Sequence, residues 1–253
     1  MFTKKIHLQE RELRRVLQER LVPSGQSYEI TVSGWSSASP NQELVLRAFG
    51  RTLMHDSKLP QEIRKIEGMS GQIYRSFINN LVETHADARY LEIGSWAGST
   101  ATAALYGNTV KCVCVDNWSQ FGGPKEVFFA NIERVRSEKI DFTFIEDDFR
   151  NVNFGAIGSF NIFMFDGPHS EQDQYDGVML AQQALDKSYI LIVDDWNWTP
   201  VRNGTFRALL STSCAISFWI EVRTTFDDTH ANIAFQDSDW HNGYFIAVIE
   251  KRL

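Results

Sequence analysis

Residues 90–102, YLEIGSWAGSTAT, lead an apolar run into an acid, two glycines and a series of small hydroxyl residues. Glu92 stands at the end of this run, where a strand is expected to be buried, and a buried carboxylate is costly unless a partner offsets the cost. Gly94 and Gly98 stand where the next helix is expected to begin. This order of acid, glycine turn and helix start predicts a ligand just outside the end of the strand.

Apolar runs of this kind recur along the chain and alternate with helical stretches, which include residues 124–138 and 170–186. Continuous apolar strands that alternate with helices are typical of a parallel sheet covered on both faces. We therefore predict an α/β fold. The five runs are ARYLEIG (88–94), VKCVCVD (110–116), DFTFIED (141–147), FNIFMFDG (160–167) and YILIVDD (189–195).

The end of the chain changes character. AISFWIEVRTTF (215–226) and GYFIAVIEKRL (243–253) are both strand-like, with only a polar loop between them. Such neighbours are expected to pair antiparallel. Together with the five parallel strands they predict a Rossmann-like sheet of seven strands with a terminal antiparallel hairpin, which is not the dehydrogenase arrangement.

The N-terminal part differs from the rest of the chain. We predict a helical extension or lid over residues 1–67, followed by the main domain over residues 68–253. Apolar residues at helical spacing predict helices over 7–21, 42–55 and 71–83. The turn-rich stretch VPSGQSYEITVSGWSSASPNQ (22–42) is interpreted as a loop or a lid. We expect the apolar faces of the extension to shape an acceptor pocket or a contact between identical subunits.

Composition excludes several classes of partner. The net charge is −7 and the pI is near 5.4, and no basic stripe is present, so we expect no nucleic-acid partner. No apolar run is long enough to cross a bilayer, so we expect a soluble, cytoplasmic protein with no membrane partner. The three cysteines show no zinc-site spacing and are interpreted as core residues.

An acidic residue stands at or just after the end of each of the five predicted parallel strands. In an open parallel sheet, ligands bind outside the carboxyl ends of the strands, which is where these acids fall. A single acid at such a place is often only a helix cap, but a series of them predicts an acidic pocket rim. The series comprises Glu92, Asp116, the run Glu146, Asp147 and Asp148, then Asp166, and finally Asp194 with Asp195.

The first two acids bear on the cofactor. GSWAGS (94–99) matches the dinucleotide pattern G-x-G-x-x-G poorly. Asp116, however, ends the next strand at the distance expected for an acid that binds ribose hydroxyls. Glu92 would complement an ammonium group, and the N–H groups after Gly98 would receive a carboxylate or phosphate. S-adenosylmethionine carries the ammonium, the carboxylate and the ribose that these groups suit.

The ordered motifs YLEIGSWAGST, CVDNW, FIEDDF, MFDGPH and LIVDDW resemble those of class I S-adenosylmethionine-dependent methyltransferases. Within that class the chain looks most similar to the metal-dependent small-molecule O-methyltransferases of the catechol and macrocin (macrolide-sugar) types. GMSGQIYRSFI (68–78) resembles the segment before the first strand in catechol-type enzymes, where the backbone meets the methionine end of the cofactor. The resemblance extends from Gly68 to the C-terminus.

The resemblance implies a role for each matching position. The methionine end of the cofactor would be surrounded by Glu92, Gly94 and Ser95, with Met69 and Ser70 from the preceding segment. Asp116 would bind the ribose, Asp147 or Asp148 would face the adenine, and Trp118 would cover the adenine ring. Trp96 departs from the usual glycine-rich loop of this class, which leaves the path of the loop open.

Asp166, Asp194 and Asp195 are expected to converge because their strands are adjacent in this fold. Three carboxylates would repel one another unless a cation or a proton relieved the repulsion, and an all-oxygen set suits Mg²⁺. Members of the resembled types bind a divalent ion with acids at these strand ends. The alternative is that Asp194 and Asp195 only cap the following helix.

His169, three residues after Asp166, is the predicted general base for the acceptor hydroxyl. In macrocin-type enzymes a histidine at this offset resembles the base. The alternative is a histidine that hydrogen-bonds in its loop or lines the adenine edge.

Other candidates are weaker. Trp196, Trp198, Trp219 and Trp240 are candidates for the wall of an acceptor pocket, but Trp219 lies in an apolar strand and is expected in the core instead. Residues 227–243, DDTHANIAFQDSDWHNG, contain His230, Asp237, Asp239 and His241 but no regular ligand spacing, so we interpret them as a long solvated loop.

The sequence therefore predicts an S-adenosylmethionine-dependent, Mg²⁺-dependent methylation of a hydroxyl on a small molecule, such as a sugar or another natural product. One alternative is a non-catalytic relative that binds the cofactor. The other is an NAD-dependent oxidoreductase, which the missing glycine pattern and the terminal hairpin disfavour.

Overall fold

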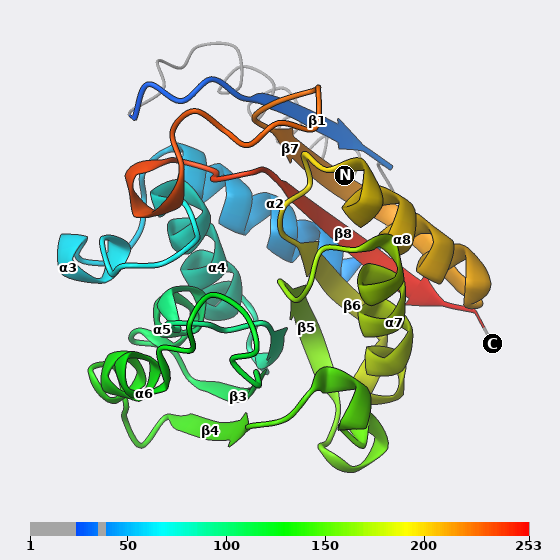
Figure 1. The fold of residues 1–253 in the computed structure, drawn as a ribbon, viewed down its shortest axis with the longest axis horizontal. Coiled ribbons are helices and arrows are strands. Elements are labelled where there is room, and N and C mark those ends of the chain that lie inside the picture. Colours follow the sequence, from blue (N-terminus) through cyan, green and yellow to red (C-terminus); the bar gives the residue numbers. More distant parts are fainter. Residues whose placement is uncertain (1–23, 35–38, 253) are drawn as a thin grey trace, which may run out of the picture.

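A computed structural model describes residues 24–34 and 39–252, and its centre is one mixed sheet of eight strands (Figure 1). The order across the sheet is β1-β7-β8-β6-β5-β2-β3-β4. The strands are β1 (Glu29–Ser33), β2 (Arg89–Ile93), β3 (Val110–Val115), β4 (Ile140–Ile145), β5 (Phe160–Phe165), β6 (Leu185–Val193), β7 (Cys214–Arg223) and β8 (Tyr244–Lys251).

The predicted α/β fold is confirmed. Strands β2 to β6 pair in parallel, and β8 then pairs antiparallel with both β6 and β7. Every residue of β5 is buried, as expected for a strand covered on both faces. The parallel strands place their carboxyl ends at one edge of the sheet.

The eighth strand corrects the expected seven. Strand β1 lies inside the stretch interpreted as a loop or lid, and it pairs antiparallel with β7 from Glu29 opposite Arg223 to Ser33 opposite Trp219. The run EITVS (29–33) is short and is flanked by turn-forming residues, so its strand pattern is too weak to recognise in the sequence. After it, Gly34 has a φ of +81°, and a Cβ there would lie 2.5 Å from the carbonyl oxygen of Ser217. The helix predicted over 7–21 lies outside the described residues, and the boundary at residue 67 stays a prediction.

Helices cover both faces of the sheet (Figure 1). Helices α2, α4 and α5 pack on one face and α7 and α8 on the other, so each face has its own apolar core. No helix in the described part of the chain is long and apolar enough to cross a membrane. The α-helices are α2 (Pro40–Leu53), α3 (Gln61–Arg64), α4 (Gln72–Thr84), α5 (Ser99–Leu105), α6 (Lys125–Glu133), α7 (Glu171–Ala181) and α8 (Thr199–Ser211). The 3₁₀ helices are η1 (Phe149–Asn151), η2 (Phe154–Ala156), η3 (Gln182–Ala184) and η4 (Phe235–Asp237).

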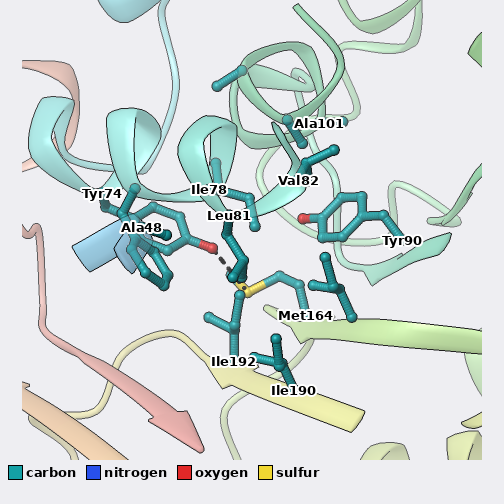
Figure 2. Packing of buried hydrophobic residues seen from close by; sticks show 14 of the residues in the cluster. Ala48, Tyr74, Ile78, Leu81, Val82, Tyr90, Ala101, Met164, Ile190 and Ile192 are labelled. Atoms are coloured by element: carbon teal, nitrogen blue, oxygen red, sulfur yellow. Dashed lines mark hydrogen bonds between the residues drawn. The ribbon is translucent and has the colours of Figure 1, made fainter. Parts of the chain in front are cut away.

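The core on the α4 face includes hydroxyl groups as well as apolar side chains (Figure 2). Tyr74 on α4 reaches down to the sheet, where its hydroxyl donates to Met164 Sδ at 3.2 Å. Cys112 and Cys114 are free and buried, which confirms their interpretation as core residues, whereas Cys214 is free but only partly buried. These packed strands hold the carboxyl edge of the sheet rigidly in place.

Candidate active site

A cavity of about 320 Å³ opens at the carboxyl ends of β2, β3, β5 and β6. Its volume is at the lower end of the range for small-molecule sites. Eight of the predicted site residues lie on its wall: Met69, Gly94, Asp116, Asp147, Asp148, Asp166, His169 and Asp195.

The glycine turn after β2 forms one wall because the backbone there leaves no room for a side chain. Gly94 has a φ of +86°, and a Cβ would lie 1.9 Å from the carbonyl oxygen of Asp166. Asp116 fixes the turn, since its Oδ2 accepts hydrogen bonds from the backbone N–H groups of Ser95 (2.8 Å) and Trp96 (2.7 Å). Asp116 Oδ1 accepts only the N–H of Trp118 among the described contacts, at 2.7 Å. A carboxylate oxygen can accept more than one hydrogen bond, so Oδ1 can also accept one from a ligand.

Glu92 lies just behind the same wall and is almost fully buried. The Tyr90 hydroxyl donates to its Oε2 at 2.5 Å, whereas its Oε1 has no hydrogen-bond partner in the described part of the chain. Burial raises the pKa of Glu92 to about 7. Glu92 does not itself line the cavity, but a buried carboxylate oxygen without a partner calls for an explanation, and a ligand ammonium group would supply the partner.

The segment before β2 meets the cavity through Met69. Ser70 is buried instead, with its Oγ 3.2 Å from Ser99 Oγ and accepting a hydrogen bond from Arg75 Nε at 2.9 Å. Arg75 is fully buried and also donates to the carbonyl groups of Arg64, Ile66 and Gly68. No local sequence pattern marks Arg75 as a site residue, although its hydrogen bonds hold the Met69 segment in shape.

The predicted adenine side is built differently from the expectation. Asp147 and Asp148 line the cavity, but Trp118 does not. The Trp118 ring stacks on Phe144, with the ring centroids 4.8 Å apart, and its Nε1 donates to the carbonyl of Trp96 at 3.0 Å. Trp118 therefore supports the turn that carries Trp96, while Phe121 supplies an aromatic ring at the cavity itself.

Asp166, His169 and Asp195, which we call the acid–histidine group, meet deep in the cavity. One ligand atom from each lies within 4.8 Å of the others. His169 Nε2 is 2.8 Å from Asp195 Oδ2, and Asn242 Nδ2 donates to Asp195 Oδ1 at 2.7 Å. Both oxygens of Asp195 are thus oriented, and the structure brings the predicted base to one of the predicted metal ligands.

The pKa values of the group are pushed apart by its surroundings. Burial, and then the charges of Asp194 and Asp195, raise the pKa of Asp166 well above its usual range. Burial alone would lower the pKa of His169, but the hydrogen bond and charge of Asp195 outweigh it and raise that pKa. Burial alone would raise the pKa of Asp195, but the hydrogen bond and charge of His169 outweigh it and lower that pKa.

Asp194 lies beside this group rather than within it. It does not line the cavity, and its Oδ1 accepts the backbone N–H of Asp195 at 2.6 Å. Its Oδ2 is buried and has no partner among the described residues, and burial raises its pKa well above the usual range. Of the two acids that end β6, only Asp195 therefore faces the cavity.

Part of the loop between β7 and β8 (residues 224–243) lines the cavity. Residues 226–230 are exposed, as the prediction of a solvated loop requires, whereas residues 238–243 are buried, which corrects that prediction. His230, Phe235, His241 and Asn242 all line the cavity, and Trp198 joins them from the start of α8. Trp240 is fully buried and Trp196 nearly so, while Trp219 is half-buried, so of the four tryptophans considered only Trp198 lines the cavity.

Gln26, in the N-terminal extension, holds this loop in place. Its Nε2 donates to the carbonyl groups of Ile233 (2.8 Å) and His241 (2.9 Å). Its Oε1 accepts the N–H groups of Asp239 (3.1 Å) and Trp240 (2.8 Å). A buried glutamine satisfied in this way cannot be recognised from sequence, because its partners lie more than 200 residues away.

Comparison with known proteins agrees with this site. Residues 91–196, from β2 to the turn after β6, match a protein family described as "Methyltransferase domain". None of the curated proteins matches the sequence significantly.

Among solved structures, TrmN from Thermus thermophilus is 15% identical with a TM-score of 0.47; the match covers 71% of this chain and 48% of TrmN, so the chain spans about half of that protein. An O-methyltransferase from Bacillus cereus in complex with SAH is 14% identical, with a TM-score of 0.47 and coverage of 84% and 92%. An rRNA methylase from Streptococcus thermophilus is 8% identical, with a TM-score of 0.44 and coverage of 72% and 96%.

The three structures differ in the activities that their names give, so no substrate is carried over from them. The family match covers the glycine turn, Asp116, Asp166, His169 and Asp195, and it agrees with the methyltransferase prediction rather than with the oxidoreductase alternative. Residues 91–196 are therefore similar to a methyltransferase domain.

Proposed function

We propose that the chain methylates a hydroxyl group on a small molecule, with His169 as the general base and a divalent cation, Mg²⁺ by preference, bound at Asp166, Asp195 and Asp194. The observation that carries the proposal is the acid–histidine group, which lies on the wall of the cavity that also contains Asp116 and Gly94. One cavity thus offers a cofactor end and a reaction end.

The residues present fit a hard divalent cation. Asp166 and Asp195 offer carboxylate oxygens within 4.8 Å of each other, and the buried Asp194 Oδ2 beside them has no other partner among the described residues. Burial, and then the negative charges of Asp194 and Asp195, raise the pKa of Asp166, and a bound cation would relieve this repulsion. Oxygen ligands of this kind favour Mg²⁺ over softer ions. When bound, such a cation lowers the pKa of the acceptor hydroxyl.

The residues at the β2 and β3 side of the cavity also suit S-adenosylmethionine. The unpartnered Glu92 Oε1 suits the ammonium group, and Asp116 Oδ1 can accept a hydrogen bond from a ribose hydroxyl. Glu92 lies behind the turn at Gly94, whereas the acid–histidine group lies on the β5 and β6 side of the cavity. The cofactor supplies the methyl group, and this chain orients it toward the acid–histidine group.

His169 is built to take the proton. Asp195 holds its Nε2, so in the neutral ring the free lone pair is on Nδ1, which has no partner among the described contacts. Nδ1 is therefore the atom that accepts the hydroxyl proton, and Asp195 stabilises the imidazolium that forms. This pairing resembles the way in which a carboxylate orients and supports a catalytic histidine in hydrolases.

A small acceptor fits the cavity better than a nucleic acid. The space is about 320 Å³, and five of the wall residues are aspartates: Asp116, Asp147, Asp148, Asp166 and Asp195. The chain as a whole carries a net charge of −7. An acidic surface repels a phosphate backbone, so the acceptor is a molecule without a polyanionic backbone.

The test is methyl transfer to defined acceptors. Purified protein is incubated with S-adenosylmethionine and Mg²⁺ and, in separate reactions, with simple phenols, sugars, total tRNA and rRNA, and S-adenosylhomocysteine is measured by mass spectrometry. We expect product with hydroxyl compounds of low molecular weight and little product after chelation of the metal. Transfer to RNA alone, or activity unchanged by chelator, would overturn the proposal. Asp141→Asn, an exposed change on β4, is the matched control for the variants of the acid–histidine group.

A further inference from the structure

Tyr244 and Tyr74 form a stacked pair of rings on the α4 face of the sheet, and the methyl-transfer chemistry leaves both without a role. Tyr244 is the first residue of β8, and Tyr74 lies on α4. Their ring centroids are 3.7 Å apart, and the ring planes make an angle of 9°. Both side chains are fully buried, so the pair carries two hydroxyl groups into an apolar core.

The two hydroxyl groups differ in their partners. Tyr74 donates to Met164 Sδ at 3.2 Å (Figure 2). The Tyr244 hydroxyl has no hydrogen-bond partner among the described residues. Since burial raises the pKa of Tyr244 well above its usual range, this hydroxyl keeps its proton and is a donor without an acceptor. A buried donor in this state calls for an explanation.

The strand register places Asp194 directly opposite Tyr244. Val193 on β6 pairs with Phe245 on β8, and because these strands are antiparallel, the next opposing pair is Asp194 and Tyr244. The side chains of opposing residues point to the same face of a sheet. Asp194 Oδ2 is also buried and has no partner in the described part of the chain. An unpaired donor and an unpaired acceptor are therefore neighbours on one face of the sheet.

On its other side Asp194 has Asp166 as its neighbour. Val193 pairs in parallel with Phe165 on β5, and the backbone N–H of Asp194 donates to the Phe165 carbonyl at 3.2 Å, so the register continues to Asp166. Because β6 lies between β8 and β5 in the sheet, Tyr244 is on the side of Asp194 that is away from Asp166. Tyr244 therefore flanks one of the proposed cation ligands without separating it from another.

The Tyr244 hydroxyl already acts on Asp194. Burial and then the charge of Asp195 raise the pKa of Asp194, whereas hydrogen bonding from the Asp195 backbone and from the Tyr244 hydroxyl opposes the rise. The contact with Tyr244 is not a complete hydrogen bond, since the hydroxyl and Asp194 Oδ2 both lack a partner among the described residues. The two groups are thus placed to pair, and the pairing is unfinished.

We propose that Tyr244 is a positioning residue for the divalent cation: its hydroxyl donates to the Asp194 carboxylate and holds it in the orientation that binds the ion. The inference rests on the proposed function and adds to it a residue that does not line the cavity. A carboxylate that binds a cation through one lone pair can accept a hydrogen bond through another. Such outer hydrogen bonds orient the ligands of a metal and raise its affinity. The stack on Tyr74 limits the movement of the Tyr244 ring and so preorganises the donor.

Two matched variants isolate this hydroxyl. Tyr244→Phe and Tyr74→Phe each remove one hydroxyl group and keep the aromatic ring, so the stacked pair is retained. Mg²⁺ is titrated by calorimetry into the full chain in the presence of S-adenosylhomocysteine. We expect Tyr244→Phe to bind Mg²⁺ about tenfold more weakly than the wild-type protein, the lower end of the usual effect of an outer hydrogen bond. Tyr74→Phe should bind the ion as the wild-type protein does, because its hydroxyl is paired with Met164.

Two further readouts separate positioning from packing. A tyrosine hydroxyl that gains a hydrogen bond changes the ultraviolet absorption of its ring, so Mg²⁺ should produce a tyrosine difference band in the wild-type protein and in Tyr74→Phe but not in Tyr244→Phe. The double variant Tyr244→Phe/Asp194→Asn should bind Mg²⁺ no more weakly than Asp194→Asn alone, because Tyr244 acts through Asp194. Both tyrosine variants should bind S-adenosylhomocysteine as the wild-type protein does, since neither side chain lines the cavity.

Equal Mg²⁺ affinity of Tyr244→Phe and the wild-type protein, equal weakening in both tyrosine variants, or a further loss in the double variant would each overturn the inference. Absence of Mg²⁺ binding or of the difference band in the wild-type protein would do so too. The readout is binding and not turnover. A protein that shows the expected pattern but transfers no methyl group therefore retains the role of Tyr244 and loses the proposed function. Mg²⁺-dependent methyl transfer with full Mg²⁺ affinity in Tyr244→Phe would do the reverse.

Discussion

His169 Nε2 lies 2.8 Å from Asp195 Oδ2, and this contact links the loop after β5 to the turn after β6. It leaves Nδ1 of His169 as the basic atom and places a carboxylate behind it. The same carboxylate is oriented on its other side by Asn242. One short chain of contacts therefore runs from the β7–β8 loop to His169, the proposed base.

Replacing His169 by glutamine should lower kcat by about a hundredfold or more, the usual contribution of a general base. The amide nitrogen of glutamine can still contact Asp195, so the affinity for S-adenosylhomocysteine should stay unchanged. Because Asp195 raises the pKa of His169, the wild-type rate should climb through a pKa above 6.5, and the variant should recover in part at high pH. Initial rates measured across a range of pH check this prediction. The control is His85→Gln, because the His85 side chain does not line the cavity. A variant with wild-type kcat would remove His169 from catalysis.

Glu92→Gln should stabilise the ligand-free protein at alkaline pH. The pKa of Glu92 is raised from 4.5 to about 7 by burial, so its ionisation destabilises the fold progressively as pH rises from the lower value to the higher one. The variant should therefore gain up to about 3 kcal/mol at pH 8 and little at pH 4, as judged by urea unfolding.

The same variant should bind S-adenosylhomocysteine more weakly, because the ammonium group loses its carboxylate. Binding by the wild-type protein at pH 6 should release a proton from Glu92, which calorimetry in two buffers of different ionisation enthalpy detects. Equal proton release by Glu92→Gln would assign the proton to another group.

Asp116→Ala should weaken binding of S-adenosylhomocysteine by about 1 to 3 kcal/mol, the range for hydrogen bonds to a charged group. The loss has two sources, since Asp116 also accepts the N–H groups of Ser95 and Trp96 that shape the glycine turn. Calorimetry measures the loss, and Asp141→Asn serves as the exposed control. Unchanged affinity would end the assignment of Asp116 to the ribose.

Much of this architecture could be predicted from the sequence because strands buried on both faces are continuously apolar and acids such as Asp166 and Asp195 follow them directly. Strand β1 could not, since five alternating residues inside a turn-rich stretch carry too weak a signal. The place of His241 on the cavity wall could not be predicted either, because it depends on contacts with Gln26, which is 215 residues away in the sequence. Trp118 was assigned to the adenine ring, but its packing on Phe144 depends on tertiary structure that no local pattern reveals.

Gln26→Met keeps the shape of the side chain but removes its four hydrogen bonds to the β7–β8 loop. We expect a loss of about 2 to 4 kcal/mol in the free energy of unfolding, because four buried backbone groups lose a partner. Binding of a phenol or sugar acceptor should weaken more than binding of S-adenosylhomocysteine, since the loop carries His241 and Asn242 and not the glycine turn. Gln61→Met, at the exposed start of α3, is the control. Equal weakening of both ligands would contradict a specific role of Gln26 on the acceptor side.

Titration of Mg²⁺ into the protein bound to S-adenosylhomocysteine, followed by calorimetry, tests the proposed reaction centre most directly. Asp166, Asp194 and Asp195 predict one bound ion, with affinity at least about tenfold lower in Asp166→Asn, Asp194→Asn and Asp195→Asn. Asp141→Asn should bind the ion as the wild-type protein does, and so should His169→Gln, because His169 is assigned as the base and not as a ligand. Absence of Mg²⁺ binding, or full affinity in all three acid variants, would contradict a cation-assisted methyl transfer at this site.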